Sequence, residues 1–373
     1  MHTEGPVRIV FAEEDTLFRL MEAAVTRRLT PGCEKALTYF FGRDFSSPLK
    51  TLMNMADRLG LPGGMEAVIC SSKDTLDKMV SSADFLVVER EPISRAHIQA
   101  GAQRIRLIQK FGRDYRNIDI AAAGEYGIKV ANVVRYSSLS SADNIMALLL
   151  ALARNLIKAH QSVLAQRDSS LNAEFEKGPL RTKFNWTSIR DIRVLAENTL
   201  GFVGLGENSG EVARRARTFG MRLVYYKRHR LSVEDETAFG GAEYLPLDEL
   251  LAQADFVSIH VPYGAETDKM IGRKELARMK PGAYLINTAR GGVIDEEALY
   301  DALRSKRIAG AALDVYKYEP VPPNCPLLDL DNIVWTPHMS GGEPGFMLRD
   351  AEDVLANIAR VWRGEAPLGL LNP

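Results

Sequence analysis

The chain has 373 residues, of which 46% are hydrophobic and 25% charged, so it is long enough for two domains and has the composition of an ordinary globular protein. Its 47 basic and 48 acidic residues nearly balance, which gives no support for a nucleic-acid partner because such a partner usually requires a basic face. The longest apolar run, residues 145–153, is too short to cross a bilayer, and the three scattered cysteines suggest neither a metal cluster nor a disulfide framework. We therefore expect a cytoplasmic protein with no membrane partner, no nucleic-acid partner and no metal site.

The first 139 residues alternate between short apolar segments and amphipathic ones. This alternation is typical of a parallel, doubly wound sheet with a helix after each strand. A stretch of helical periodicity from 13 to 61, broken at Pro31-Gly32 and at Ser46-Ser47-Pro48, enlarges the opening of this half, and we interpret its apolar stripe as core packing. Strands are expected near residues 6–12, 66–71, 84–88, 104–109 and 128–132.

The same alternation resumes after a long helical segment in the middle of the chain. Ser140 is a plausible N-cap for one helix that runs to about 165, with Asp143 at the third helical position, and a polar stretch from 166 to 185 is expected to be a surface connection. Further strands are expected near residues 200–203, 223–226, 256–260, 284–287, 310–314 and 333–336. The sequence thus predicts an α/β protein with two doubly wound, parallel-sheet, Rossmann-like domains joined by long helices. One domain comprises 1–139 and 343–373, and the other comprises 140–342.

A glycine turn marks the start of the second domain. Gly204 and Gly206 follow an apolar strand and precede a helix. Gly204 permits a tight turn, and Gly206 lets the backbone approach a phosphate without a Cβ in the way. The helix N-terminus then offers unpaired N–H groups and a positive dipole end, which suits the pyrophosphate of a dinucleotide. Ser209 stands where such a turn usually has a third glycine, and Gly210 follows it.

Four segments, in this order and spacing, resemble the D-2-hydroxyacid dehydrogenase family. They are 117–132, the glycine turn, 287–295, and 310–320 followed by 336–342. The resemblance runs from about Ala83 to the C-terminus. It implies an NAD(P)-dependent oxidoreductase that interconverts a 2-hydroxy acid and a 2-oxo acid by hydride transfer. It also implies that the first domain, flavodoxin-like, binds the substrate, that the second binds the dinucleotide, and that the protein forms a homodimer.

Three residues carry the chemistry that the resemblance implies. Reduction of a 2-oxo acid develops negative charge on the carbonyl oxygen, which calls for a proton donor and a fixed cation. Arg290, at the carboxyl end of an expected strand, matches the arginine that binds the carboxylate and the carbonyl, a planar group that suits a guanidinium. His338 matches the acid/base, and Glu319 matches the carboxylate that orients it. Because formate dehydrogenases carry glutamine in place of this glutamate, Glu319 argues against formate as the substrate.

The end of the second strand of the dinucleotide domain is basic. An acidic residue there would bind the ribose 2′-hydroxyl of NAD, but this chain has Lys227, with Arg228 and Arg230 close by. Basic side chains would bind a 2′-phosphate by charge-assisted hydrogen bonds, so we expect NADP(H) to be preferred over NAD(H). The resemblance assigns the following further residues to the cofactor site: Glu207, Asn208, His260, Val261, Pro262, Thr288, Ala289, Asp314 and Gly341.

The expected substrate loop departs from the family. Gly112-Arg113-Asp114 stands where Gly-Val-Gly is common, and Asp143-Asn144 replaces a common glutamate–histidine pair. The resemblance also places Lys110 and Arg135 on loops near the substrate. One interpretation is a substrate with extra negative charge, such as a phosphorylated, phosphonate or dicarboxylic compound, and the other is drift at loop positions.

Two alternatives to this function stay open at this point. The first is a dinucleotide-sensing, corepressor-like binding protein with little turnover, for which the region from Cys33 to Leu61 offers a surface. The second keeps the enzyme class but acts on an oxidisable phosphorus acid or phosphonate. The remaining histidines lack a chemical context and are expected at the surface; they are His2, His97, His160 and His229.

Overall fold

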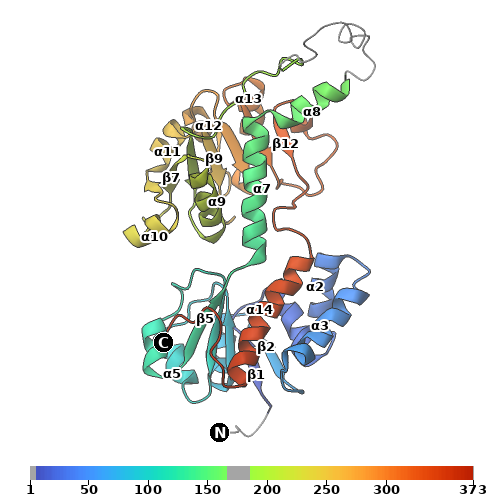
Figure 1. Ribbon diagram of the computed structural model, residues 1–373, viewed down its shortest axis with the longest axis vertical. Helices are drawn as coiled ribbons and strands as arrows, with labels where there is room; N and C mark the ends of the chain where they lie inside the picture. The colour runs from blue at the N-terminus through green and yellow to red at the C-terminus, as the bar shows by residue number, and fades with distance from the viewer. Residues whose placement is uncertain (1–5, 166–184, 373) are drawn as a thin grey trace, which may run out of the picture. The chain divides into compact units, whose positions relative to one another are not determined.

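The computed structural model describes residues 6–165 and 185–372 and divides into two compact units. The first unit is Met1–Ser137 with Gly342–Pro373, and the second is Ser138–Gly341. Each is a parallel sheet with helices on both faces (Figure 1). The predicted fold class is therefore confirmed. The predicted connecting stretch at 166–185 lies, apart from its last residue, outside the described residues. Among the described helices, none is long and apolar enough to cross a membrane.

The first sheet has the strand order β2-β1-β3-β4-β5, which is the order of flavodoxin-like folds. Alternate residues of its strands point into different cores, so Ile9 and Phe11 of β1 face one layer of helices and Val10 faces the other. Its strands are β1 (Arg8–Phe11), β2 (Glu66–Ile69), β3 (Phe85–Val88), β4 (Leu107–Phe111) and β5 (Lys129–Val133). The first layer is α1 (Thr16–Thr26), α3 (Ser46–Leu59) and α14 (Gly345–Trp362), and the second is α4 (Lys73–Met79), α5 (Arg95–Gly101) and α6 (Ile120–Glu125).

The helical region near the N-terminus packs as part of the first unit. Pro31 begins α2 (Pro31–Phe41), because a proline is tolerated in the first turn of a helix, where its missing N–H would have no partner. Pro48 lies in the first turn of α3 for the same reason. The side chains of Leu52 and Met55 are fully buried, so the predicted apolar stripe of α3 contributes to the core.

The second sheet has the order β12-β11-β10-β9-β6-β7-β8. The order reverses between β6 and β9, and open α/β sheets bind ligands at such a reversal. The strands are β6 (Thr199–Val203), β7 (Arg222–Tyr226), β8 (Glu243–Tyr244), β9 (Phe256–Ile259), β10 (Tyr284–Asn287), β11 (Gly310–Leu313) and β12 (Ile333–Trp335). One face is covered by α7 (Tyr136–Ala153) and α9 (Glu207–Thr218), the other by α11 (Leu247–Gln253), α12 (Arg273–Arg278) and α13 (Glu296–Arg304) (Figure 1). The sequence did not predict β8 or α10 (Val233–Ala238).

The long central helix differs from the prediction at both ends. It begins at Tyr136, four residues before the expected N-cap Ser140, because the Tyr136 N–H donates to the Asp350 carboxylate at 2.8 Å. It also ends at Ala153, and α8 (Leu156–Ala165) is a separate helix. Asn155 separates the two in the left-handed conformation, with φ of +49°, and its side-chain amide donates to the Arg190 carbonyl at 2.7 Å.

Asp350 provides a test of this helix start. Burial raises the pKa of Asp350 from 3.8 to about 6, so ionising it costs more in the folded protein than in the unfolded chain. The stability that this group contributes is therefore complete below 3.8 and is lost as the pH rises through about 6. Asp350→Asn keeps an acceptor for the Tyr136 N–H but cannot ionise. We expect the free energy of unfolding of this variant, relative to that of the wild type, to be roughly 2 kcal/mol higher at pH 8 than at pH 4. Urea unfolding at both pH values measures this change, and a stability difference that does not vary with pH would contradict it.

Candidate active site

The glycine turn lies at the reversal of the second sheet. Gly204 follows β6 with φ of +94°, and a Cβ there would lie 2.8 Å from the carbonyl oxygen of His260, which follows β9. A Cβ on Gly206 would meet no described atom within 4 Å, so the start of α9 is open on that side. The Gly206 N–H donates to the Ser209 hydroxyl at 2.8 Å, and a Cβ on Gly210 would lie 2.3 Å from the ring of Phe239. Ser209 therefore closes the turn, and close packing of the helix requires glycine one residue later.

A cavity of about 550 Å³ opens beside this turn. Two glycines, the start of a helix, basic side chains and apolar side chains surround it, which fits a phosphate-bearing nucleotide. The predicted cofactor residues that line it are Gly204, Gly206, Lys227, Arg228, His260, Val261 and Pro262. Six further residues line the cavity and were not predicted from the sequence: Leu205, Tyr226, His229, Glu266, Thr267 and Met270. The predicted residues outside its lining are Glu207, Asn208, Arg230, Thr288, Ala289, Asp314 and Gly341.

The basic residues after β7 have different environments. The Lys227 ammonium donates to the Leu205 carbonyl at 3.2 Å, inside the glycine turn. The Arg230 guanidinium donates to Glu236 at 2.9 Å. Hydrogen bonds from Arg230 and from the buried Tyr225 hydroxyl lower the pKa of Glu236. This arrangement directs Arg230 toward a carboxylate of the helix α10 that follows it.

His260 forms an uncharged part of the cavity wall. Its Nε2 atom lies 2.8 Å from the Ser258 hydroxyl, and its ring packs near Phe202. Burial lowers the pKa of His260 to about 3, because the surrounding chain disfavours the charged ring. The ring is therefore neutral at physiological pH.

A histidine–carboxylate pair lies at the carboxyl ends of the neighbouring strands. The Nδ1 atom of His338, after β12, lies 2.6 Å from the carboxylate of Glu319, and the other carboxylate oxygen accepts from the Tyr316 N–H at 3.0 Å. The side chains of His338 and Glu319 are 42% and 37% exposed, so the pair can be reached from solvent. Since Nδ1 is engaged by the carboxylate, proton exchange with another molecule must use Nε2.

A buried carboxylate holds the turn that carries His338. Asp314, which follows β11, accepts hydrogen bonds from the Thr336 hydroxyl at 2.5 Å and from the N–H groups of Met339 at 3.0 Å and Ser340 at 2.9 Å. His338 itself has φ of +53°, which is uncommon for a residue other than glycine. The structure therefore places Asp314, predicted in the cofactor site, directly beneath the histidine turn.

Arg290 lies on a loop that packs against the segment leading to Glu319. The buried side chain of Asn287, at the end of β10, donates to the Arg290 carbonyl and accepts from the Ala289 N–H, both at 3.0 Å. A Cβ on Gly291 would lie 2.0 Å from the carbonyl carbon of Tyr316, so the two loops run in direct backbone contact. The loops of Arg290, Glu319 and His338 thus emerge from the same edge of the sheet, at the ends of β10, β11 and β12.

Residues that depart from the family pattern have structural partners in the second unit. The Asn144 side chain donates to the Ser340 hydroxyl at 2.7 Å, which ties α7 to the histidine turn. Asp143 pairs with Arg215 of α9 at 2.8 Å. The Asn208 side chain accepts from the Ser138 hydroxyl at 2.7 Å. These side chains contribute to helix packing around the site.

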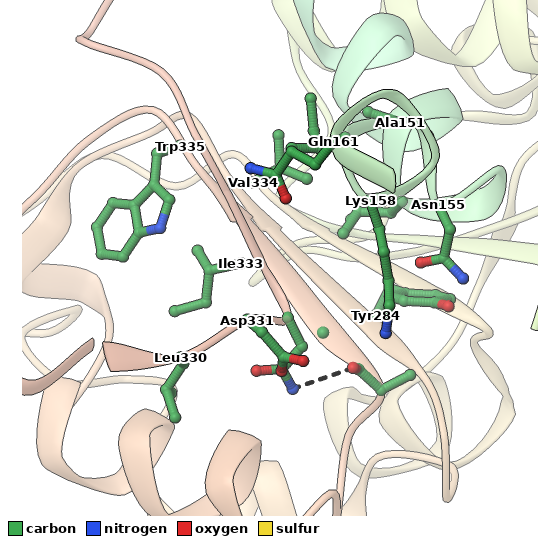
Figure 2. Close-up of a pocket in the computed structure, with 15 residues that line it drawn as sticks. Ala151, Asn155, Lys158, Gln161, Tyr284, Leu330, Asp331, Ile333, Val334 and Trp335 are labelled. Atoms are coloured by element: carbon green, nitrogen blue, oxygen red, sulfur yellow. Dashed lines mark hydrogen bonds between the residues drawn. The ribbon is translucent and has the colours of Figure 1, made fainter. Parts of the chain in front are cut away.

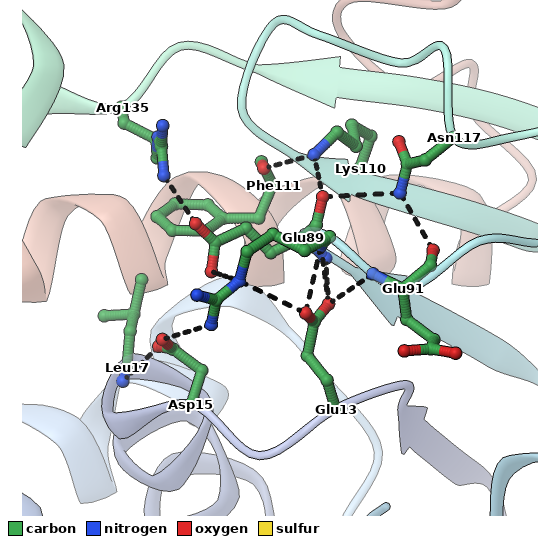
Figure 3. A network of polar contacts seen from close by, with 10 residues as sticks. Glu13, Asp15, Leu17, Glu89, Glu91, Lys110, Phe111, Asn117 and Arg135 are labelled. Atoms are coloured by element: carbon green, nitrogen blue, oxygen red, sulfur yellow. Dashed lines mark hydrogen bonds and ion pairs between the residues drawn. The ribbon is translucent and has the colours of Figure 1, made fainter. Parts of the chain in front are cut away.

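The predicted substrate residues of the first unit divide into two groups. Lys110 and Arg135 belong to a network around Glu89 (Figure 3): Lys110 is buried and donates to the carbonyls of Glu89 and Phe111, and Arg135 pairs with the Glu89 carboxylate at 2.6 Å. Burial raises the pKa of Glu89 despite this pairing. Glu13 completes the network by accepting from the N–H groups of Glu89, Arg90 and Glu91 (Figure 3).

The other group lies on the turn after β4. Gly112 has φ of +106°, and Arg113 is exposed, while its carbonyl accepts from the Asn132 side chain at 3.3 Å. Asp114 pairs with Arg116. The side chains of Arg113, Asp114 and Arg116 are therefore all exposed on this turn.

The histidines that were expected at the surface and that the structure describes differ in how far they are buried. His97 is buried and lies 2.7 Å from the Asp77 carboxylate, so its predicted surface position is wrong. Its Nδ1 atom accepts from the Ser94 N–H and so helps to begin α5. His229 lines the cavity, His160 is exposed, and His2 lies outside the described residues.

The chain is similar to known proteins in both sequence and fold. The model of the D-isomer specific 2-hydroxyacid dehydrogenase NAD binding domain matches residues 146–340, more than half of the chain. A glyoxylate reductase of Korarchaeum cryptofilum is 39% identical over 302 residues, covering 81% of this chain and 86% of that protein. A D-3-phosphoglycerate dehydrogenase of Methanocaldococcus jannaschii is 34% identical over 310 residues, covering 83% of this chain and 56% of that protein. The crystal structure of the TT0316 protein from Thermus thermophilus, 29% identical, superposes with a TM-score of 0.51 over 98% of this chain and 100% of that chain.

The backbone contact at Gly291 can be tested by substitution. We expect Gly291→Ala to lower the melting temperature by several degrees, because an added Cβ would displace the backbone at Tyr316 and Lys317. Gly206→Ala is the matched control, since a Cβ there meets no described atom within 4 Å and should leave the melting temperature unchanged. Equal melting temperatures for the two variants would show that the loops are not in close contact.

Proposed function

The chain belongs to the D-isomer specific 2-hydroxyacid dehydrogenase family, and we propose that it reduces a 2-oxo acid to the 2-hydroxy acid with His338, Glu319 and Arg290 as its catalytic residues. The observation that carries this proposal is the His338–Glu319 pair at 2.6 Å, held by the turn on Asp314. We further propose that the second unit binds the dinucleotide and that the first unit binds the substrate.

The proposed chemistry follows from these side chains. The nicotinamide cofactor, when bound, supplies the hydride that reduces the carbonyl carbon. The Arg290 guanidinium binds the substrate carboxylate by two parallel hydrogen bonds and fixes the carbonyl beside it. His338 donates the proton from Nε2 to the carbonyl oxygen as that oxygen gains negative charge, and Glu319 stabilises the ring while it is charged. In the reverse direction, His338 accepts the same proton from the hydroxyl.

For the cofactor, we propose a preference for NADP(H) over NAD(H). NAD-binding domains usually have an acidic residue at the end of the strand that corresponds to β7, where it binds the ribose 2′-hydroxyl. In this chain Lys227 stands at that position, with Arg228 and Arg230 close by. Lys227 and Arg228 line the cavity and can bind a 2′-phosphate, whereas Arg230 is directed toward Glu236.

For the substrate, we propose a 2-oxo acid with additional negative charge, such as a phosphorylated, phosphonate or dicarboxylic compound. The support is the exposed Arg113 on the turn after β4, where the family commonly has an uncharged residue. Arg135 pairs with Glu89, and the buried Lys110 donates to main-chain carbonyls, so we propose for these two a role in shaping the substrate loops.

We also propose that two copies of the chain associate through α8. None of the described side chains of α8 is buried, yet Leu156, Ile157, Val163 and Leu164 are apolar and between 41% and 56% exposed. Beside α8, a cavity of about 520 Å³ lies against the edge strand β12 (Figure 2). An apolar helix next to a sheet edge is a surface that a second copy would cover.

The catalytic roles can be tested by loss of reduced-nicotinamide absorbance. We expect His338→Ala to lower kcat by about 100-fold or more, because the general acid is lost. We expect Glu319→Gln to lower kcat as well, with a melting temperature close to that of the wild type, because both side chains are partly exposed. Glu297→Gln, an exposed position on α13, is the control. Full activity in His338→Ala would rule out the proposed acid.

The cofactor and substrate are tested in the same assay with NADPH and NADH in parallel. We expect the higher kcat/KM with NADPH, and a higher kcat/KM for phosphorylated or phosphonate 2-oxo acids than for glyoxylate or hydroxypyruvate. Equal values for the two cofactors would contradict the cofactor preference, and best turnover of acids with uncharged side chains would contradict the substrate class. Binding of dinucleotide without turnover of any substrate would instead favour a sensing role.

The proposed assembly is tested by analytical ultracentrifugation. We expect a dimer for the wild type and a monomer for the double variant Leu156→Glu with Val163→Glu, because two carboxylates would be buried in the contact. Val233→Glu, at an exposed apolar position on α10, should stay dimeric. A monomeric wild type would refute the proposal.

A further inference from the structure

An ion pair lies on the wall of the cavity beside the glycine turn. The Arg228 guanidinium lies 2.7 Å from the Glu266 carboxylate, and both residues line the cavity. Arg228 comes two residues after β7, and Glu266 lies on the loop that follows β9, so the pair joins the two sides of the sheet reversal. The two side chains are 71% and 74% exposed.

Arg228, Arg230 and Lys227 have different hydrogen-bond or ion-pair partners. Arg230 is bound to Glu236, which also accepts from the Tyr225 hydroxyl, and it does not line the cavity. Lys227 donates to a carbonyl of the glycine turn. The partner of Arg228 is an exposed carboxylate, and an exposed ion pair contributes little stability, so an incoming anion can replace Glu266.

Glu266 therefore has two effects on a phosphate at this position. It occupies the guanidinium that would otherwise bind the phosphate by two hydrogen bonds, and its own negative charge repels the phosphate, which carries between one and two negative charges. A ribose hydroxyl is uncharged, so the carboxylate does not repel it, and the hydroxyl gains much less than a phosphate from the guanidinium.

We propose that Glu266 is a specificity-determining residue for the cofactor: its carboxylate competes with the 2′-phosphate of NADP(H) for Arg228 and so limits the preference for NADP(H) over NAD(H). This inference rests on the proposed binding of dinucleotide in the second unit. Glu266 lowers the affinity for NADPH relative to the affinity for NADH, whichever of the two cofactors the wild type binds more tightly.

The test is a fluorescence titration of the full chain with NADPH and with NADH, without substrate. We expect E266Q to lower the Kd for NADPH about tenfold, since it removes one negative charge within a few ångströms of the phosphate, and to change the Kd for NADH by less than about twofold. We expect R228Q to raise the Kd for NADPH, and we expect the E266Q effect to disappear in the double variant E266Q/R228Q, because Glu266 acts through Arg228.

E243Q is the matched control, since Glu243 forms a comparable exposed pair with Arg222 at 2.7 Å and neither residue lines the cavity. An unchanged ratio of the two Kd values in E266Q would overturn the inference, and so would an E266Q effect that persists in the double variant. A wild type that binds NADH more tightly would contradict the proposed cofactor preference, while the shift caused by E266Q would still support the inference.

Discussion

The proposed chemistry depends on the hydrogen bonds that the buried Asp314 carboxylate accepts from the turn carrying His338. The carboxylate accepts from a side chain and two main-chain N–H groups of the segment 336–340, and these bonds hold His338 in a left-handed conformation. In a buried setting such charge-assisted hydrogen bonds are stronger than in water, and they fix the turn before any substrate arrives. Because these bonds fix the backbone position of His338, the Glu319 carboxylate only has to orient the imidazole ring.

Local signals in the sequence were sufficient for most of the fold, and the resemblance to the family was sufficient for the His338–Glu319 pair. Both sheets are parallel and covered on both faces, so most strands are short apolar runs that stand out between amphipathic segments, and the polar two-residue β8 is the exception. The features that could not be predicted depend on residues far apart in the chain. Asp350 begins α7 although it lies 214 residues from Tyr136, and the break at Asn155 depends on a bond to Arg190. The same holds for Glu266, which has no recognisable motif and gains its place in the cavity wall from the order of the strands.

The structure also shows why a group of basic residues in sequence is a poor measure of positive charge in space. Acidic and basic residues are almost equal in number, so carboxylates are available as partners for cations across the fold. Arg230 is paired with Glu236, and Arg135 with Glu89. Lys110 is satisfied by main-chain carbonyls. How strongly a cation can attract an anionic ligand depends on how easily its partner can be replaced, and burial and hydrogen bonding decide that.

The two-segment composition of the first unit has a consequence for biosynthesis. Its core combines β1, β3 and β4 with Val354, Leu355 and Ile358 of α14, which the ribosome makes only after the whole second unit. The second unit is one continuous segment and can complete its core while it is being translated, whereas the first sheet keeps part of an apolar face uncovered until α14 emerges. The nascent chain therefore exposes a hydrophobic surface while the second unit is being made, and the helices α1 and α3, which pack on that same face, shield part of it during this interval.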